Sequence, residues 1–289
     1  MENKDFLIHR DGLNGTIKFV STLSQNAVPN SDFEVHTHYQ EFEIYQFLEG
    51  ELFFAFEGRR ISVEEGTVII IPNGVLHRPI IKNNCRYFRK RILFDKDLFV
   101  RFNTADFTLY KKLIKRNILI LSKEAIEKNG IDELIRDIEN RLALNSPYND
   151  FCALISLFTL LIKAEEHSEQ IQNIDSYVQS EMISKILRYI DEHLSKDLNY
   201  KMISNAFFLS EKSLYKIFKN ETGFALGNYI NQRRIIMAQS VLNAGGSAKT
   251  AAYTAGFKDF STFYRCFLKN VGVTPTEYSN LRKQYGNFE

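Results

Sequence analysis

Four side chains of types that bind metal ions occur within the first eighty residues. His36 and His38 are separated by one residue, Glu43 follows shortly after them, and His77 lies further along. Because alternate residues of a strand face the same side, both histidines can point into a common interior, where Glu43 and His77 would add a carboxylate and a third imidazole. Three nitrogen ligands and one oxygen ligand suit a divalent transition metal. The spacing therefore permits a metal ion.

A second interpretation of these residues needs no metal. They can line a site for a sugar- or amide-sized ligand through hydrogen bonds, or serve only as scaffold. Tyr45 shares the strand face of Glu43, and Arg78 is next to His77, so both could also contact a ligand, although packing or surface roles suit them equally. The candidate ligand-binding residues are His36, His38, Glu43, Tyr45, His77 and Arg78.

Runs rich in β-branched and aromatic residues surround this set and predict strands. Gly, Pro and Asn residues of the kind found in turns separate the runs. Short strands at such spacing are typical of a β-barrel or a sandwich. The runs cover residues 16–20, 43–48, 52–56, 68–71 and 88–94.

A longer pattern within these strands resembles the cupin superfamily over residues 15–95. Its two consensus motifs are matched by His36, His38, Glu43, Gly50, Gly66, Pro72, Gly74 and His77. The resemblance implies a cupin-like barrel in which the three histidines and Glu43 occupy that family's metal-ligand positions. It also implies that residues 5–15 form an arm able to close over the barrel.

One sequence unit near the C-terminus is repeated, and equivalent positions of the two copies are 49 residues apart. The first member of each copy predicts a helix N-cap, the apolar pair predicts a buried i, i+4 stripe, and the glycine predicts the left-handed residue that ends the helix. The repeated pairs are Ser210/Asp259, Leu214/Phe263, Phe218/Phe267, Gly223/Gly272 and Tyr229/Tyr278.

A shorter helical pattern precedes each copy, at residues 200–209 and 247–257. Helix, tight turn and capped helix is the order of elements in a helix-turn-helix motif. The face opposite each apolar stripe is basic and carries hydroxyl groups, which suits contacts with phosphates and base edges of double-stranded DNA. The predicted DNA-binding residues are Lys212, Ser213, Tyr215, Lys216 and Lys219 in the first copy, and Lys258, Ser261, Thr262, Arg265 and Lys269 in the second.

Residues 247–282 resemble the C-terminal signature of AraC/XylS-type transcription regulators. The matching residues are Gly256, Phe257, Asp259, Phe263, Arg265, Phe267, Gly272, Pro275 and Tyr278. The chain departs from the family at Ala248 and at Ala251-Ala252, where a larger apolar residue and an Ile-Ala pair are usual. The resemblance implies two helix-turn-helix motifs that enter successive major-groove segments, about 34 Å apart.

The charge is divided unevenly along the chain. From residue 178 onward there are 15 Lys and Arg against 9 Asp and Glu, a net charge of +6, whereas residues 1–177 have 22 against 26, a net charge of −4. This asymmetry predicts that the C-terminal half meets a polyanion. Three scattered cysteines, a charged N-terminus and no long apolar run predict a cytoplasmic protein that is neither exported nor embedded in a membrane.

The middle of the chain predicts helices. An amphipathic pattern at residues 131–142 suits a helix packed on the barrel. Residues 151–162 are apolar on every side, so that helix must be covered on two sides. The barrel can cover one side, and we predict that the same helix of a second subunit covers the other in a homodimer; full burial within one chain is the alternative.

These patterns predict an α+β protein of two domains. Residues 1–166 form a cupin-like barrel with packing and dimerisation helices, residues 167–177 form a polar linker, and residues 178–289 form an all-α domain with two helix-turn-helix motifs. The predicted function is a DNA-binding transcription regulator of the AraC type, controlled by a small-molecule effector in the barrel, with a carbohydrate as the first candidate.

Two other functions compete with this prediction. A metal-dependent cupin enzyme with an accessory helical domain is favoured by the full His/His/Glu/His set and disfavoured by the doubled basic helices. A binder of single-stranded nucleic acid or RNA would need stacking aromatics on an exposed sheet, which the strand pattern does not offer. We therefore predict no catalytic residues.

Overall fold

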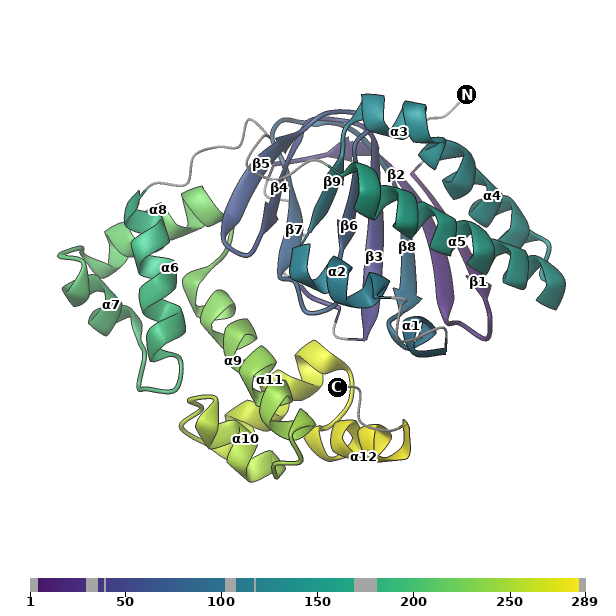
Figure 1. Cartoon of the computed structure of the whole chain (residues 1–289). Helices are drawn as coiled ribbons and strands as arrows, with labels where there is room; N and C mark the ends of the chain where they lie inside the picture. Colours follow the sequence, from purple (N-terminus) through teal and green to yellow (C-terminus); the bar gives the residue numbers. More distant parts are fainter. Residues whose placement is uncertain are drawn as a thin grey trace.

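The inner framework of the N-terminal half is a pair of β-sheets (Figure 1). The computed structural model describes residues 5–29, 36–38, 40–101, 108–116, 118–168 and 181–285. A six-stranded sheet has the order β1-β2-β8-β3-β6-β9, and a three-stranded sheet has the order β5-β4-β7. The strands are β1 (Phe6–Gly12), β2 (Ile17–Ala27), β3 (Glu41–Glu49), β4 (Leu52–Phe56), β5 (Arg59–Val63), β6 (Val68–Ile71), β7 (His77–Ile81), β8 (Cys85–Asp95) and β9 (Leu119–Leu121).

The two sheets pack face to face around one apolar cluster. Tyr45, Phe47 and Tyr87 of the larger sheet join Phe54 and Phe56 of the smaller sheet in it. Side chains alternate along each strand, so the neighbouring residues face outward. Each sheet therefore has a second face that other elements must cover.

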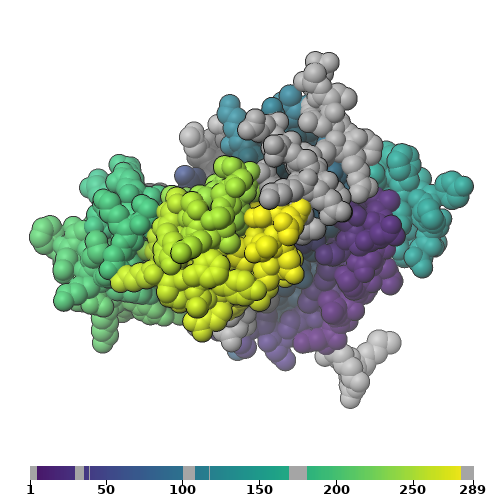
Figure 2. All heavy atoms as spheres, turned by 90° about the horizontal axis from the view of Figure 1, so that it is seen from below, coloured from purple at the N-terminus to yellow at the C-terminus, as the bar shows by residue number. Residues whose placement is uncertain are grey.

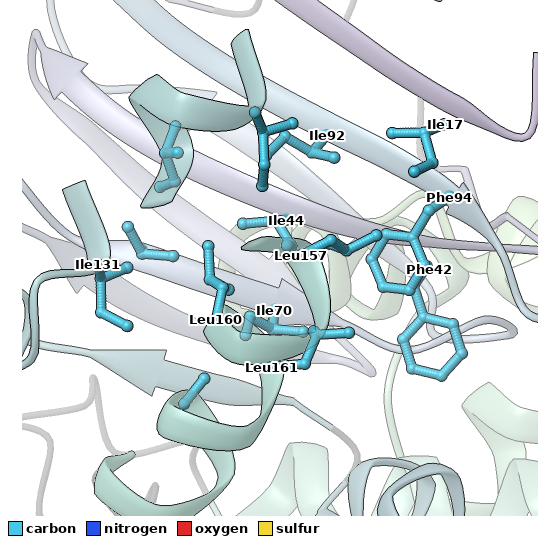
Figure 3. Packing of buried hydrophobic residues seen from close by; sticks show 14 of the residues in the cluster. Ile17, Phe42, Ile44, Ile70, Ile92, Phe94, Ile131, Leu157, Leu160 and Leu161 are labelled. Atoms are coloured by element: carbon cyan, nitrogen blue, oxygen red, sulfur yellow. The ribbon is translucent and has the colours of Figure 1, made fainter. Parts of the chain in front are cut away.

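Helices cover the outer face of the six-stranded sheet. Leu157, Leu160 and Leu161 pack against Ile44 and other branched residues of the strands (Figure 3). This cluster contains fully buried leucines and isoleucines from both layers, each of which removes apolar surface from water. The helices of the N-terminal half are α1 (Asp97–Arg101), α2 (Leu109–Arg116), α3 (Lys123–Asn129), α4 (Ile131–Ala143) and α5 (Pro147–His167).

The C-terminal part is helical throughout its described residues. Its helices are α6 (Glu181–His193), α7 (Tyr200–Ala206), α8 (Glu211–Thr222), α9 (Leu226–Asn243), α10 (Ala248–Thr254), α11 (Phe260–Val271) and α12 (Pro275–Tyr285). In Figure 2 the helices coloured green to yellow occupy one continuous region of the face seen from below. The predicted α+β class with two domains is confirmed.

Helices α8 and α11 begin and end as the repeat predicts. The Ser210 side chain accepts a hydrogen bond from the Ser213 amide, and the Asp259 side chain accepts one from the Thr262 amide. Gly223 and Gly272 end the helices in the left-handed region, with φ of +76° and +82°. Because the same cap and stop recur at the same offset, the two helices have equal length.

The outer face of the three-stranded sheet is covered by the C-terminal helices. Ala55 and Leu76 belong to one buried cluster with Ile186, Leu214 and Phe218. A Cβ atom on Gly223 would lie 2.4 Å from the Cδ1 atom of Ile80 and 3.2 Å from the Cβ atom of Ala55, so the end of α8 lies directly against the outer face of the sheet. The barrel and the first helix-turn-helix motif therefore share a core.

The expected N-terminal arm and the start of the expected linker differ from the structure. Residues 6–12 of the expected arm form strand β1, which pairs with β2 from Phe6↔Leu23 to Gly12↔Ile17, so they do not close over the barrel. Helix α5 runs to His167 and thus includes the first residue of the predicted linker; residues 169–177 lie outside the described residues. Among the residues that the structure describes, no helix has the length and apolar composition needed to cross a membrane.

Candidate functional site

The predicted metal-binding residues lie together inside the barrel. Each of His36, His38, Glu43 and His77 offers one ligand atom, and these four atoms lie within 4.8 Å of one another. Glu43 comes from β3 and His77 begins β7, so the two sheets each supply one of the buried members. The spacing of residue types in the sequence therefore predicted a set that the fold does bring together.

The two N-terminal histidines reach the set without a regular strand. His36 forms only an isolated bridge to His77, in which each backbone amide donates to the other residue's carbonyl oxygen at 3.2 and 3.0 Å. His38 follows in an irregular segment, and its Nε2 atom lies 2.8 Å from Oε2 of Glu43. The two histidines thus share a direction, as predicted, although they lie outside the named strands.

Hydrogen bonds to His77 limit where its proton can be. Its Nδ1 atom lies 2.9 Å from the Val75 carbonyl oxygen, which can only accept, so Nδ1 carries a proton. Its Nε2 atom lies 3.2 Å from Oε2 of Glu43. Nε2 is therefore the ring atom that faces the carboxylate and that would be offered to a metal ion.

Glu43 is ionised although it is buried. Burial acts to raise its pKa, but the hydrogen bonds from His38 and His77 outweigh burial and hold the pKa of Glu43 well below its ordinary value. The buried carboxylate therefore demands positive charge beside it. A divalent cation would meet that demand.

The residues present fit a divalent metal by donor type and spacing. His36, His38 and His77 would supply imidazole nitrogens, Glu43 would supply a carboxylate oxygen, and the Val75 carbonyl orients the His77 ring. Such an ion could polarise a bound hydroxyl or carbonyl group of a ligand. Without it, the same atoms offer hydrogen bonds to a polar ligand.

The two other ligand candidates lie on different faces. Tyr45 is buried in the inner cluster, and its hydroxyl is hydrogen-bonded to that of Tyr87. Arg78 pairs with Ala55, whereas its neighbour His77 pairs with Phe56 of the inner cluster. Arg78 therefore lies on the outer side of β7, away from the His/Glu set, and the strand does not bring it to the candidate site.

Sequence reasoning missed two inward residues on β8. Arg89 lies opposite Phe47 and Arg91 opposite Tyr45, so both share the face of the inner cluster. The alternation of Tyr87, Arg89 and Arg91 along a predicted strand was the signal that could have identified them.

The predicted DNA-binding face of α8 is exposed. Leu214 and Phe218 are fully buried, so the opposite side of the helix faces outward. Tyr215 is 41% exposed, and the Lys219 ammonium stands 5.7 Å from the centre of its ring. Exposed residues of the predicted set on α8 are Lys212, Tyr215, Lys216 and Lys219, with Ser213 partly buried.

The corresponding face of α11 is exposed as well. Phe263 and Phe267 are fully buried below it. Lys258, in the turn before the helix, pairs with Asp197 at 2.7 Å, so part of its charge is already balanced. The exposed residues of the predicted set are Lys258, Ser261, Thr262, Arg265 and Lys269.

Contacts along α9 and α6 tie the two motifs together. Arg234 of α9 donates to the carbonyl oxygens of Leu194 and Lys196 at 3.1 and 3.0 Å. Gly256 has φ of +89°, and a Cβ atom there would lie 2.0 Å from the Leu194 carbonyl oxygen. The turn of the second motif is therefore pressed against the chain that follows α6, which restricts movement between the motifs.

The outward side of α5 is apolar. Phe151 and Ile155 are each 54% exposed and Ile162 is 39% exposed, so the helix is not fully buried within one chain. The exposed row also includes Tyr148. This overturns the alternative of complete burial, while the predicted homodimer stays a prediction.

Two family models match the chain. A helix-turn-helix domain matches residues 203–281, and a cupin domain matches residues 25–87. The first spans both capped helices, and the second spans the four residues of the His/Glu set. The two resemblances read from the sequence are thereby confirmed.

Relatives that match the chain include regulators. The regulatory protein PocR of Salmonella typhimurium is 33% identical over 97 residues, which are 33% of this chain and 32% of that protein. The lactose operon transcription activator of Staphylococcus xylosus is 21% identical over 256 residues, 87% of this chain and 88% of that protein. The chain thus spans less than two thirds of PocR but most of the lactose operon activator.

A solved structure with similarity is the DNA-binding domain of AdpA in complex with a target DNA. It covers 37% of this chain and 96% of that chain, at 19% sequence identity and a TM-score of 0.35. A TM-score of this size is too low to identify a fold by itself.

Proposed function

We propose that this chain, which combines a cupin domain with a helix-turn-helix domain of the AraC type, is a transcription regulator that binds double-stranded DNA and is controlled by a small-molecule effector in its barrel. The observation that carries the proposal is the duplicated, capped helix with an exposed basic face. Two such helices tied to one connecting helix can engage two adjacent stretches of major groove.

The exposed side chains divide by chemistry into two groups. Lys216, Lys219, Arg265 and Lys269 would neutralise phosphates or read guanine. The hydroxyl-bearing residues and Lys212 would contact base edges or sugars near the helix N-termini. The net charge of +6 on this half of the chain favours the same partner.

The effector would bind at the His/Glu set on the inner side of the barrel. Buried donors and acceptors in this set suit a ligand with several hydroxyl groups, and a carbohydrate is the first candidate. The relative named as a lactose operon activator aligns with most of this chain, which agrees with that choice.

A short path leads from this site to the DNA-binding helices. Leu76, which precedes His77, donates its amide to Oε1 of Glu57 at 2.9 Å. Oε2 of Glu57 accepts a hydrogen bond from Arg233 of α9 at 3.0 Å, and Arg233 also donates to Asp191 of α6 at 3.0 Å. A ligand that moves His77 would thus act on Arg233 through two residues, provided that it binds the two arrangements with unequal affinity.

The DNA-binding function is tested by recovering genomic DNA bound to the protein and measuring its affinity for the recovered sites. We expect affinity to fall steeply as salt rises from about 50 to 200 mM, because lysine and arginine contacts release counterions from DNA. Affinity that is equal for recovered and unrelated DNA would reject sequence-specific recognition.

A metal-dependent cupin enzyme is the second candidate, and the complete donor set of three histidines and one glutamate favours it. Metal analysis of protein purified without added metal, with His38→Ala as the comparison, tests for the ion. Stoichiometric metal together with no binding to recovered DNA would favour the enzyme over the regulator.

A further inference from the structure

The inner face of β8 carries two arginines next to the His/Glu set. Tyr45 lies opposite Arg91, and Glu43 lies opposite Leu93, two residues further along β8. Directly opposed residues on one face have Cβ atoms about 5 Å apart, and diagonal neighbours about 7 to 8 Å. Arg91 is therefore a diagonal neighbour of Glu43, and Arg89 lies one step further from the set.

Neutral groups hold Arg89 in place. Its side chain is nearly buried, its Nη1 atom donates to the Tyr87 hydroxyl at 3.2 Å, and its guanidinium stands 5.3 Å from the centre of the Tyr87 ring. Burial raises the pKa of both Tyr45 and Tyr87, so their phenols are uncharged at neutral pH. These phenols orient the Arg89 guanidinium on the inner face of β8.

Arg91 lacks a carboxylate partner among the described residues. On the same strand, Arg86 pairs with Glu49 at 3.3 Å and Lys90 pairs with Glu139 at 2.7 Å. The Nε atom of Arg91 is buried and makes no hydrogen bond with a described residue. A guanidinium that is partly removed from water is costly unless its donors are paired.

Glu43 is not a close ionic partner of Arg91. Its Oε2 atom already lies 2.8 Å from Nε2 of His38 and 3.2 Å from Nε2 of His77. Its charge therefore acts on Arg91 only from a distance, and the donors of Arg91 stay available to a ligand on the inner side of the barrel.

We propose that Arg91, with Arg89 beside it, binds the acidic group of the effector, and that the effector is a small organic anion with a carboxylate or phosphate ester. The proposal rests on the proposed function, because it assigns the ligand class of the same effector site. A ligand of monosaccharide size that spans both groups would place its acid at Arg91 and its hydroxyl groups at the His/Glu set. A sugar acid or a sugar phosphate has both features.

Inorganic phosphate is a suitable probe, because it presents the anionic group alone. Thermal unfolding of the full chain is followed by circular dichroism while phosphate replaces chloride at constant ionic strength. The proteins are wild type, Arg91→Gln, Arg91→Lys and Arg86→Gln, the last being a matched loss of charge at an exposed position of β8. Phosphate at about ten times its dissociation constant should raise the wild-type Tm by roughly 3 °C or more.

We expect Arg86→Gln to respond as the wild type does, Arg91→Lys to keep part of the response, and Arg91→Gln to lose most of it. The DNA-binding face also attracts phosphate, and that contribution is the response that remains in Arg91→Gln. Equal responses in wild type and Arg91→Gln, or no response in either, would overturn the proposal.

Paired ligands distinguish the two sources of the anion. Glucose, gluconate and glucose 6-phosphate share a carbon chain and differ in their acidic group. Stabilisation of the wild type by either acid, lost in Arg91→Gln, supports the proposal and names the acid. Stabilisation by glucose that persists in Arg91→Gln rejects an anionic effector and leaves an effector site in the barrel intact. Binding of the wild type to recovered DNA is measured separately, so a failure of the proposed function is recognised by itself.

Discussion

At the scale of single residues, Glu43 concentrates negative charge inside the barrel. Burial acts to raise its pKa, but hydrogen bonds from His38 and His77 outweigh burial and hold the pKa well below its ordinary value. Arg265 illustrates the opposite situation, since it is exposed on the face of α11 and its side chain is open to solvent. A buried carboxylate with a shifted pKa is typical of a ligand site, whereas an exposed arginine on a helix face is typical of a nucleic-acid interface.

Replacing Arg265 with alanine tests the DNA interface. If Arg265 reads a base, Arg265→Ala should weaken binding to a recovered site by roughly 1 to 3 kcal/mol, because a bidentate contact with guanine is lost. Band-shift titration at fixed salt measures this change. Arg136→Ala, on α4 of the barrel and also solvent-exposed, is the matched control and should bind with unchanged affinity. Unchanged affinity and footprint for Arg265→Ala would remove this residue from the interface.

At the scale of elements, the two recognition helices depend on their caps. Ser210 and Asp259 occupy equivalent positions, but only Asp259 carries a charge. Hydrogen bonds from Thr262, first through its side chain and then through its backbone, lower the pKa of Asp259. The same helix start therefore responds to pH in one repeat and not in the other.

Asp259→Asn tests this difference. A carboxyl group whose pKa is lowered by folding stabilises the protein above its unfolded pKa of about 3.9, and that stabilisation is lost as the pH falls through the folded pKa. The wild type should therefore exceed Asp259→Asn in Tm at pH 7, and the gap should shrink below about pH 4. Melting curves across this range measure the gap, and a gap that is constant with pH would contradict the assignment.

Ser210→Ala is the uncharged counterpart in the first repeat. Loss of the hydroxyl removes the hydrogen bond to the Ser213 amide, which lies at 3.1 Å, and should cost about 1 kcal/mol of stability. This cost should be the same at pH 7 and pH 4, because no titrating group is lost. If the loss of stability in Ser210→Ala varied with pH, the charge on Asp259 would not explain the difference in pH dependence between the two N-caps.

At the scale of the whole molecule, different helices of the same chain cover the two outer faces of the barrel. Helices α4 and α5 cover the larger sheet, and the first helix-turn-helix motif covers the smaller one. The outward row of α5 is left exposed, and its apolar residues make it the surface on which a second copy of the chain would pack.

Ile155→Glu tests the dimer. A charge in the middle of an apolar interface should weaken self-association by roughly thirtyfold or more. Sedimentation should find the wild type dimeric at micromolar concentration and the variant monomeric. Met182→Glu on α6, a partly exposed apolar residue of the C-terminal part, is the matched control and should remain dimeric. A wild type that is monomeric at micromolar concentration would exclude this dimer.

Glu57→Gln tests the contact between barrel and DNA-binding helices. The substitution removes the charged partner of Arg233 across the interface. It should lower the free energy of unfolding by about 1 kcal/mol, since both side chains are largely buried. Hydrogen exchange of the amides in the β4–β5 turn should become faster. Asp191→Asn removes the other partner of Arg233, within the helical part, and should leave that exchange unchanged. Equal effects of the two variants would argue against a specific connection across the interface.

The sequence by itself determined the local elements and the identity of the chemical groups. The 49-residue repeat predicted both capped helices, because caps, apolar pairs and glycine stops act within a few residues of one another. The spacing of the histidines and Glu43 predicted a set that the fold assembles, and the periodicity of residues 131–142 predicted α4. These features depend on local geometry, so they can be read without tertiary structure.

Only the tertiary structure decided which surfaces meet. It placed Arg78 on the outer side of β7, turned the expected arm into strand β1, and brought Arg89 and Arg91 to the inner face of β8. It also joined Glu57 to Arg233 across 176 positions of the chain. Such pairings follow from strand register and from which apolar faces bury each other, and these are set by the balance of packing over the whole molecule rather than by any short segment.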